Sequence, residues 1–349
     1  MSLFFLKNLQ KNGISTEIYS LINDAQVKSY TNLVVSNCSA YDYLNNAIPN
    51  LEKLTTQYYD TFSISSRFTG YLSNITIGDF YNSLSSSCCD GTAILGGLNS
   101  TARTDAEKKS NNVSSSNSSS NSSDSSNSSN SSSTQNNSSS EQDVKNQEEQ
   151  NIATNPDNLL AGNTSIIGEQ GIENLGIAIF NKDILCGELT ATESICHLLI
   201  TNDVDSCIIS IVNPLSTDEK MELQLTPAKN SKISTKINSD SVKISIDINV
   251  DADIKTLEEN IDYANVEILD EISCATKDYL KNEFNSYLNK LSKEYNSDID
   301  HFGIHVLKHF ATIDDFENFN WKEKFSNAEF EVNVNVNMIS SLLITRTWL

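Results

Sequence analysis

Apolar and polar residues alternate most regularly near the end of the chain, in the segment that starts at Ala328. The apolar residues that share one parity are Phe330, Val332, Val334, Val336 and Met338. The positions between them hold Glu331 and three asparagines. A period of two is typical of a strand with one buried and one solvated face. The pattern therefore predicts a closing strand that completes a sheet begun by earlier strands.

Similar patterns mark several earlier segments between Gly176 and Lys255. The stretch "GIAIFNKDILCGELT", from Gly176, has apolar runs on both sides of Asn181-Lys182-Asp183, which predicts a β-hairpin. Four more segments predict strands: "CIISIVNP", "KMELQLTPAKN", "SKISTKIN" and "DSVKISIDINVDADIK". In the last one, every second residue from Val242 to Ala252 is apolar. These segments predict an antiparallel sheet with one face in water.

Other segments of the same region have the apolar spacing of helices. From about Tyr263 to Tyr295 apolar residues recur three or four positions apart, which predicts a long helix across the sheet. Thr190 and Glu193 have the spacing of a capping box, so a helix should start directly after the hairpin. The segment "DHFGIHVLKHFA" predicts another helix before the closing strand. The expected fold class is α+β, with mainly antiparallel sheets packed with helices and a long helix across a curved C-terminal sheet.

The first hundred residues predict a smaller set of elements. A strand is expected at residues 30–37, a helix capped by Ser39 at 39–47, and a strand followed by a helix at 75–86. Before them, "NGISTEIYSLINDAQ" has the spacing of an amphipathic helix. No upstream segment offers an apolar surface for that helix to cover.

Composition divides the chain near its middle. Residues 111–143 consist almost entirely of serine and asparagine, which offer too little apolar surface to offset the entropy of ordering. We expect a linker over residues 100–158. The predicted divisions are a remnant of a first domain at 1–28, a small α+β domain at 29–99, the disordered linker, and a C-terminal α+β domain at 159–349.

Charge and cysteine spacing exclude some classes of function. A net charge of −22 disfavours binding to nucleic acid or to an anionic lipid surface. The seven cysteines contain no CxxC pair, so their spacing does not predict a zinc knuckle or a disulfide framework. The apolar run at Leu3–Leu6 is far shorter than a signal-peptide core or a membrane span.

Candidate catalytic and metal-binding groups are few. His301, His305 and His309 are four residues apart, so on a helix they would share one face and could bind zinc. The segment contains Gly303 and lacks the glutamate of an HExxH motif, so we favour a partly exposed helix face. The sequence predicts no catalytic, cofactor-binding or metal-binding residues and no cofactor.

The remaining polar and aromatic candidates also favour structural roles. Three acidic pairs are expected to be solvated: Asp203/Asp205, Asp251/Asp253 and Asp314/Asp315. Trp321 and Trp348 are expected to be core or sheet-edge anchors. Gly96-Gly97 lacks the context of a phosphate-binding loop.

Three stretches in sequence order resemble one known family. The first is the hairpin from Gly176 to Leu189, which carries Gly-x-Ala-x-Phe-x-x-Asp-x-Leu-x-Gly-x-Leu and is followed by a helix with Glu193. The second is "LTPAKNSKISTKIN" with "VKISIDINVDADI" before the long helix, and the third is "YNSDIDHFGIHVLKHF" with "WKEKFSNAEFEVNVNVNM". Together they resemble the Ger(x)C spore germination lipoproteins, the C-subunits of nutrient germinant receptors, over about residues 171–349.

The resemblance implies a non-catalytic subunit that acts with integral-membrane A- and B-type partners at the outer face of the spore inner membrane. The front of the chain is less similar, with Lys28 where the family has arginine. The family's lipoprotein signal peptide, acylated cysteine and most of its first domain are absent from the sequence. These departures predict a truncated or degenerate member.

Two other functions are alternatives to this one. An extracellular adhesin or glycan-binding module could use the Ser/Asn tract as a stalk, and a wall-anchoring signal, which the sequence lacks, would favour it. An enzyme built on the three histidines would require stoichiometric zinc.

Overall fold

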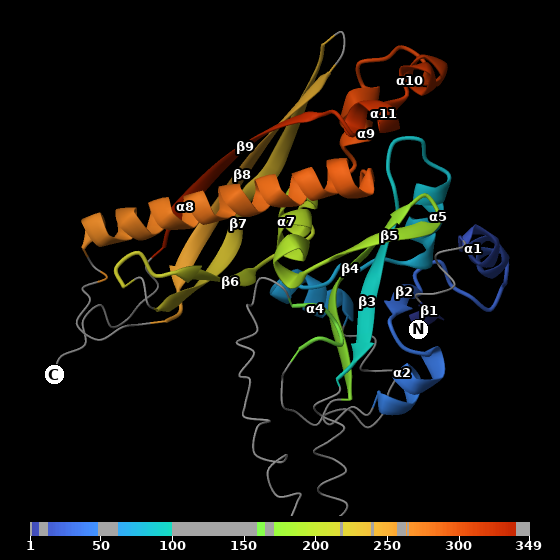
Figure 1. The fold of residues 1–349 in the computed structure, drawn as a ribbon, viewed down its shortest axis with the longest axis horizontal. Helices are drawn as coiled ribbons and strands as arrows, with labels where there is room; N and C mark the ends of the chain where they lie inside the picture. Colours follow the sequence, from blue (N-terminus) through green and yellow to red (C-terminus); the bar gives the residue numbers. More distant parts are fainter. Residues whose placement is uncertain are drawn as a thin grey trace, which may run out of the picture.

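The computed structural model describes residues 2–6, 13–47, 62–99, 159–164, 171–216, 219–238, 241–256, 263 and 265–339, with only the backbone of 2–6, 62 and 63. Their strands form a five-stranded sheet and a four-stranded sheet. Figure 1 shows the two sheets together with the helices that cover them.

The five-stranded sheet combines strands from residues 2–98 with strands from residues 172–189. Its strands, in spatial order, are β1 (Ser2–Leu6), β2 (Asn32–Ser36), β3 (Thr92–Leu98), β4 (Ile172–Asn181) and β5 (Ile184–Leu189). The pairs β1–β2 and β2–β3 are parallel, whereas β3–β4 and β4–β5 are antiparallel. The predicted hairpin at Asn181–Asp183 is therefore the β4–β5 connection.

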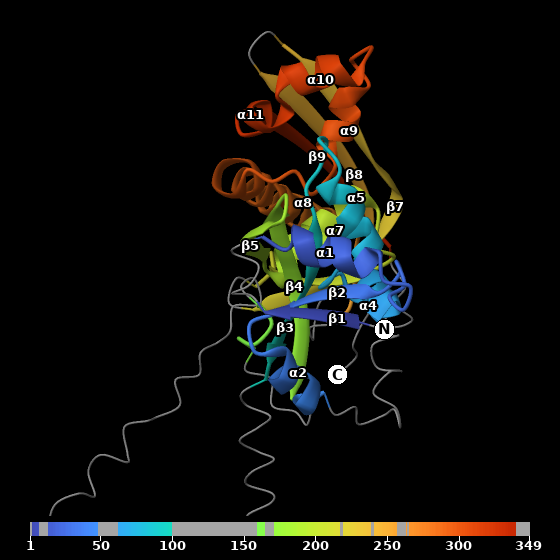
Figure 2. The same ribbon diagram turned by 90° about the vertical axis from the view of Figure 1, so that its right-hand side faces the viewer.

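Helices cover both faces of this sheet (Figure 2). They are α1 (Ser15–Ile22), α2 (Ala40–Asn46) and α5 (Ile77–Leu84), whereas α4 (Phe62–Thr69) contacts the strand that starts at Cys207. Ile18 of α1 and Phe80 of α5 are buried on one face with Leu33 and Phe180, and Tyr43 of α2 is buried on the other. The apolar face of α1 thus covers β2 and β4, a surface that the preceding sequence did not reveal.

The four-stranded sheet holds the longest strands. They are, in spatial order, β6 (Cys207–Val212), β7 (Lys220–Ile237), β8 (Val242–Ile254) and β9 (Glu329–Met338). Along β8 the even-numbered residues are buried and the odd-numbered residues are more exposed, as the alternation predicts. One continuous strand, β7, replaces the two strands expected at residues 220–230 and 231–238.

Helices α7 (Ala191–Thr201) and α8 (Val266–Asn289) pack on the apolar face of this sheet. Thr190 and Glu193 form the predicted capping box of α7. The long helix α8 crosses the sheet and continues into a π-helical turn, η3 (Lys290–Tyr295) (Figure 1). Three short helices lead to β9: α9 (Phe302–Leu307), α10 (Ile313–Phe319) and α11 (Trp321–Phe325). The predicted α+β class is confirmed.

The closing strand β9 completes the sheet, but its direction differs from the expectation of an all-antiparallel sheet. It pairs with β8 in parallel, with Ile244 beside Phe330 and Val250 beside Val336. The helices α8 to α11 form the connection that parallel neighbours require. On the exposed face, polar side chains pair across the two strands in four hydrogen bonds: Ser245 with Glu331, Asp247 with Asn333, Asn249 with Asn335, and Asp251 with Asn337.

The pairing of strands also differs from the expected separation of residues 29–99 and 159–349. Ala93 of β3 is the register partner of Ala178 of β4, so the two segments share one sheet. The segment 1–28 likewise contributes β1 and α1 to that sheet instead of a separate remnant. Local periodicity could not reveal this because strand pairing joins positions far apart in the sequence. The predicted linker at 100–158 lies outside the described residues.

Among the helices in the described ranges, none is both long and apolar enough to cross a membrane.

Candidate functional site

Hydrogen bonds between Asp90 and Asp298 connect the segment before β3 with the segment after η3. The backbone N–H of Asp90, before β3, donates to the carbonyl of Asp298 at 2.9 Å. The N–H of Asp298 donates back to the Asp90 carboxylate at 3.1 Å. The other carboxylate oxygen of Asp90 accepts from the N–H of Lys182 at 2.8 Å and from Nζ of Lys322 at 3.2 Å. One residue therefore ties the β4–β5 turn, the segment after η3, and α11 together.

The buried carboxylate of Asp298 organises the start of α9. It accepts hydrogen bonds from the backbone N–H groups of Phe302 and Gly303, at 3.0 and 2.7 Å, and from Nε1 of Trp321 at 2.9 Å. Burial raises the pKa of Asp298 to about 7, although the three donors favour its charged form. Gly303 is required for close packing, since a Cβ there would lie 2.1 Å from the carbonyl oxygen of Cys88.

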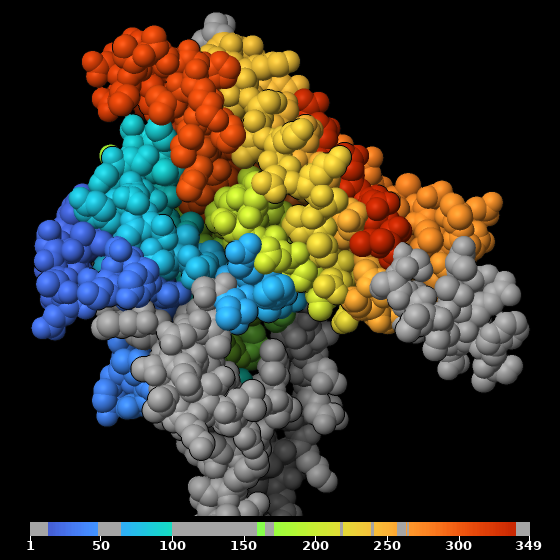
Figure 3. Space-filling model, turned by 180° about the vertical axis from the view of Figure 1, so that it is seen from behind, coloured from blue at the N-terminus to red at the C-terminus, as the bar shows by residue number. Residues whose placement is uncertain are grey.

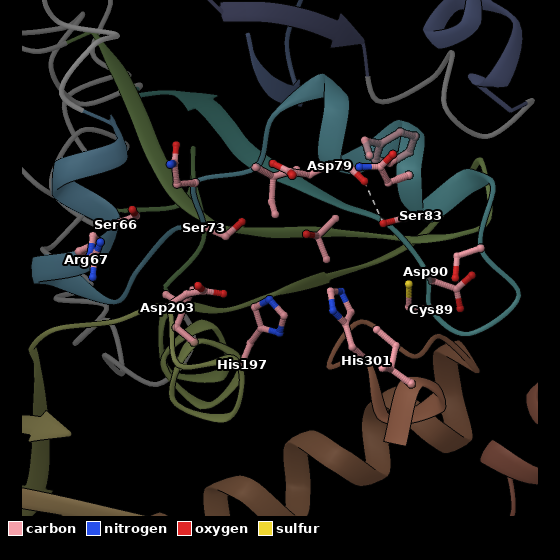
Figure 4. Close-up of a pocket in the computed structure, with 18 residues that line it drawn as sticks. Ser66, Arg67, Ser73, Asp79, Ser83, Cys89, Asp90, His197, Asp203 and His301 are labelled. Carbon is pink, nitrogen blue, oxygen red and sulfur yellow. Dashed lines mark hydrogen bonds between the residues drawn. The ribbon is translucent and has the colours of Figure 1, made fainter. Parts of the chain in front are cut away.

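Next to Asp90, a pocket of about 610 Å³ opens between α4, α5, α7 and α9. Figure 4 shows His197 of α7 and His301, the residue before α9, pointing into it from one side. Ser73 and Asp203 point into it from other elements (Figure 4). From behind, the surface shows the segment of α5 lying against α9 to α11 (Figure 3). The pocket thus lies where segments from before residue 100 and after residue 190 meet.

A buried polar cluster forms the wall behind His197. Its Nδ1 lies 2.7 Å from Oδ1 of Asp300, and the hydroxyl of Tyr287 donates to the same oxygen at 2.9 Å. The side chain of Asp300 is fully buried and that of His197 is 5% exposed. Burial, together with the charge of Asp300, raises the pKa of Tyr287 well above its usual range, so its hydroxyl keeps its proton.

This cluster fixes the orientation of the His197 ring. Nδ1 faces the Asp300 carboxylate and the Tyr287 hydroxyl, so the other ring nitrogen, Nε2, lies on the side away from this cluster. Within the described residues, Nε2 makes no hydrogen bond to a hydroxyl or thiol. The site therefore presents a polar ring atom in a fixed position to the pocket.

His301 supplies a second imidazole to the same pocket. It has a left-handed backbone conformation with φ of 63°, which turns the chain from η3 into α9. Loss of hydration lowers the pKa of His301, and the nearby His197 lowers it further, while Asp300, Asp203 and Asp79 act in the opposite direction. The carboxylates of Asp203 and Asp79 therefore lie near enough to influence the ring electrostatically.

The structure does not bring the three predicted histidines to one helical face. His301 precedes α9, His305 lies within it, and His309 follows its end. Nε2 of His309 lies 2.9 Å from the hydroxyl of Thr235, away from the pocket. Over the described ranges, no group of three or more His, Cys, Asp and Glu side chains could hold a metal ion. The prediction of no catalytic, cofactor or metal residues stays a prediction.

The acidic pairs lie at exposed or half-buried positions, and the side chain of Asp253 is only 14% exposed and pairs with Lys255. Asp205 pairs with Arg67 on the surface, and Asp251 belongs to the β8–β9 hydrogen bonds. Asp315 accepts a hydrogen bond from the hydroxyl of Thr312, the N-cap of α10. Asp203 is exposed and lines the pocket.

The expected anchor role of Trp321 agrees with its burial and its bond to Asp298. Trp348 lies outside the described residues. All seven cysteines, including the adjacent Cys88 and Cys89, are free thiols.

No sequence motif or spacing predicts a functional role for Asp90, His197, Asp298 or Asp300. One signal was present for His197, which interrupts the apolar run "SICHLLI" on the buried face of a capped helix. The aspartates gave no signal, because a short polar stretch such as "NSDID" is usually solvated.

Comparison with known proteins agrees with this fold. Residues 175–341 match the family described as spore germination B3/GerAC like, C-terminal. A solved structure, described as the crystal structure of the GerBC protein, superposes with a TM-score of 0.57 and 13% identity. The match covers 97% of this chain and 78% of that one. No curated protein matches the sequence.

The matched region contains the hairpin, the long helix and the closing strand on which the resemblance rested. Residues 175–341 thus form a C-terminal domain of the spore germination B3/GerAC-like class. The solved GerBC structure shares the fold of the chain.

Proposed function

We propose that this chain is a subunit of a nutrient germinant receptor of bacterial spores and that it works without catalysis. The observation that carries the proposal is the family match over residues 175–341. That region includes β4 to β9 and α7 to α11, so it contains the whole four-stranded sheet and its helices. In this role the protein transmits a nutrient signal towards germination.

The proposed partners are integral-membrane subunits of the A and B types, at the outer face of the spore inner membrane. A single acyl chain anchors a protein only marginally, so contacts with these partners would help to hold this subunit at the membrane. We place the contact on the exposed face of β8 and β9, where polar side chains are held in place by hydrogen bonds across the two strands.

Deletion of the gene tests the proposal. Spores lacking it should lose the response to at least one nutrient among individual amino acids, bile-type triggers and sugars. Expression of the chain from its own locus should restore that response. Unchanged germination with every nutrient would contradict the proposal.

A second experiment addresses the partners. The tagged protein should co-purify with the two integral-membrane subunits from detergent-treated spore membranes. Replacement of Asn333 and Asn335 by lysine on the exposed face should reduce this recovery without unfolding the protein. Equal recovery of both forms would show that the contact lies elsewhere.

A further inference from the structure

The pocket beside His197 has features of a built ligand site. Its volume of about 610 Å³ lies within the range of small-molecule sites in proteins. Apolar side chains of Ile75, Phe80 and Leu198 line part of it, and polar groups line the rest. Such a mixture can bury a small apolar body and orient its polar end.

One buried polar group in this wall has no partner among the described residues. Ser73 is 2% exposed, and its hydroxyl oxygen makes no hydrogen bond there. Figure 4 shows this hydroxyl directed into the pocket. Buried polar groups are nearly always hydrogen-bonded, so an unpaired one facing a cavity indicates a place for a polar ligand atom.

The second polar group is His197. Its Nδ1 lies 2.7 Å from Asp300, and the ring points into the pocket (Figure 4). The ring is fixed in place by burial and by the Tyr287–Asp300 hydrogen bond. A ligand meets here a polar group that needs no rearrangement before it can bind.

The charges around the pocket favour a cation. Three carboxylates line it, those of Asp79, Asp90 and Asp203, against one guanidinium, that of Arg67. Arg67 is already engaged with Asp205 through two hydrogen bonds, of 2.9 and 3.0 Å. An anionic ligand would therefore face uncompensated negative charge.

Two of these carboxylates are also engaged. Asp79 is the acidic member of the α5 capping box, and Asp90 accepts from Lys322. The side chain of Asp203 makes no hydrogen bond or ion pair with any described residue and points into the pocket (Figure 4). It is the carboxylate that remains to bind a ligand.

We propose that this pocket binds a small molecule with a protonated amine attached to a compact apolar group. The ammonium group donates to the Asp203 carboxylate, and the hydroxyl of Ser73 and the ring of His197 face further polar atoms of the ligand. The apolar group packs against Ile75, Phe80 and Leu198. This inference deepens the proposed function, because it gives the receptor subunit a ligand site of its own.

Titration calorimetry of the full chain at pH 7 tests the proposal with three matched probes. Leucinamide carries the amine and an apolar side chain, N-acetyl-leucinamide lacks the charge, and 4-methylpentanoate replaces the amine end by a carboxylate. We expect saturable one-site binding of leucinamide. Acetylation should weaken it at least tenfold, and the carboxylate should show no binding.

Variants connect the binding to the pocket. Asp203→Asn should weaken leucinamide at least tenfold, and since Asp203 is exposed the fold should persist. Asp314→Asn removes an exposed carboxylate of α10 and should leave the affinity unchanged. Absent binding of leucinamide, equal binding of the acetylated probe, or unchanged affinity of Asp203→Asn would each overturn the inference.

The two proposals fail in different ways. If leucinamide does not bind while deletion spores lose a nutrient response, only the ligand site is wrong. If leucinamide binds as expected while germination of the deletion spores is normal, the receptor role is wrong and the site remains.

Discussion

At the scale of single residues, Asp298 shows how one buried carboxylate can hold several segments. It accepts from two backbone N–H groups at the start of α9 and from the Trp321 indole of α11. Its own N–H and carbonyl are paired with Asp90, which precedes β3. The loss of this group would leave three buried donors without their acceptor.

Asp298→Asn tests this role. An amide has only one acceptor oxygen, and its NH2 group would face at least one of the three N–H donors. We expect a loss of about 2 to 4 kcal/mol in the free energy of unfolding, measured by urea denaturation. The exposed Asp314→Asn should change it by less than about 0.5 kcal/mol. A loss no larger than that of Asp314→Asn would contradict the role.

The raised pKa of Asp298 also predicts a pH dependence. Its folded-state pKa is about 7, whereas an unfolded aspartate has a pKa of about 3.9. Between these values the folded state binds a proton that the unfolded state lacks, so this group's contribution to stability is largest below pH 4 and falls as pH rises to 7.

We compare the free energy of unfolding of the wild type with that of Asp298→Asn. The difference, wild type minus variant, should decrease by up to about 4 kcal/mol from pH 4 to pH 7. Urea midpoints at intervals of half a pH unit would measure it. A difference that grows towards pH 7 would show that the three donors hold the carboxylate charged.

At the scale of elements, β5 can contact the turn after α8 only because Gly187 has no side chain. A Cβ on Gly187 would lie 2.3 Å from the ring of Tyr295, in the π-helical turn. Glu193 of α7 also binds Lys290 of that turn at 2.7 Å. The end of the long helix is thus fixed at two points, against β5 and against α7.

Gly187→Ala should therefore destabilise the protein by about 1 to 3 kcal/mol through overpacking. Thermal unfolding would measure the loss. Combining it with Tyr295→Leu should recover part of the loss, because the smaller side chain leaves room for the methyl group. If the two changes are simply additive, the clash with Tyr295 is not the cause.

The elements themselves were largely predictable, since each depends on local periodicity and capping. The alternation from Val242 to Ala252 predicts β8, and the capping box of Thr190 and Glu193 predicts the start of α7. The helical spacing of apolar residues after Tyr263 predicts α8. The parallel direction of β9 and the continuity of β7 were not predictable, because they depend on pairing across the sheet. The polar groups of the pocket were hidden for the same reason, since Ser73, His197 and Asp203 meet only in the fold.

At the scale of the whole molecule, the pairing of β3 with β4 joins the two sides of the Ser/Asn-rich segment. Both strands are buried in the middle of the five-stranded sheet, and α1 and α5 pack over residues from each side. Neither side can bury its apolar surface without the other.

A chain divided after Asn130 should therefore reassemble. The co-expressed fragments 1–130 and 131–349 should co-purify and show the far-ultraviolet circular dichroism of the intact protein. Ala178→Asp places a charge at a fully buried position beside Ala93 and should abolish the association. A soluble, folded fragment 131–349 in the absence of its counterpart would contradict this view.

The polar pairs on β8 and β9 have a consequence for the alignment of these strands. Along β9 the unit valine-asparagine repeats, and β8 opposes it with an apolar residue at every second position. A slip by two residues would place valine beside an apolar residue again and asparagine beside a polar residue again. The aromatic ring of Phe330 breaks this degeneracy, since it packs 5.8 Å from Phe302 and 6.1 Å from Phe325. Phe330 thus fixes the register of β9, which could otherwise shift along β8 by two residues at a time.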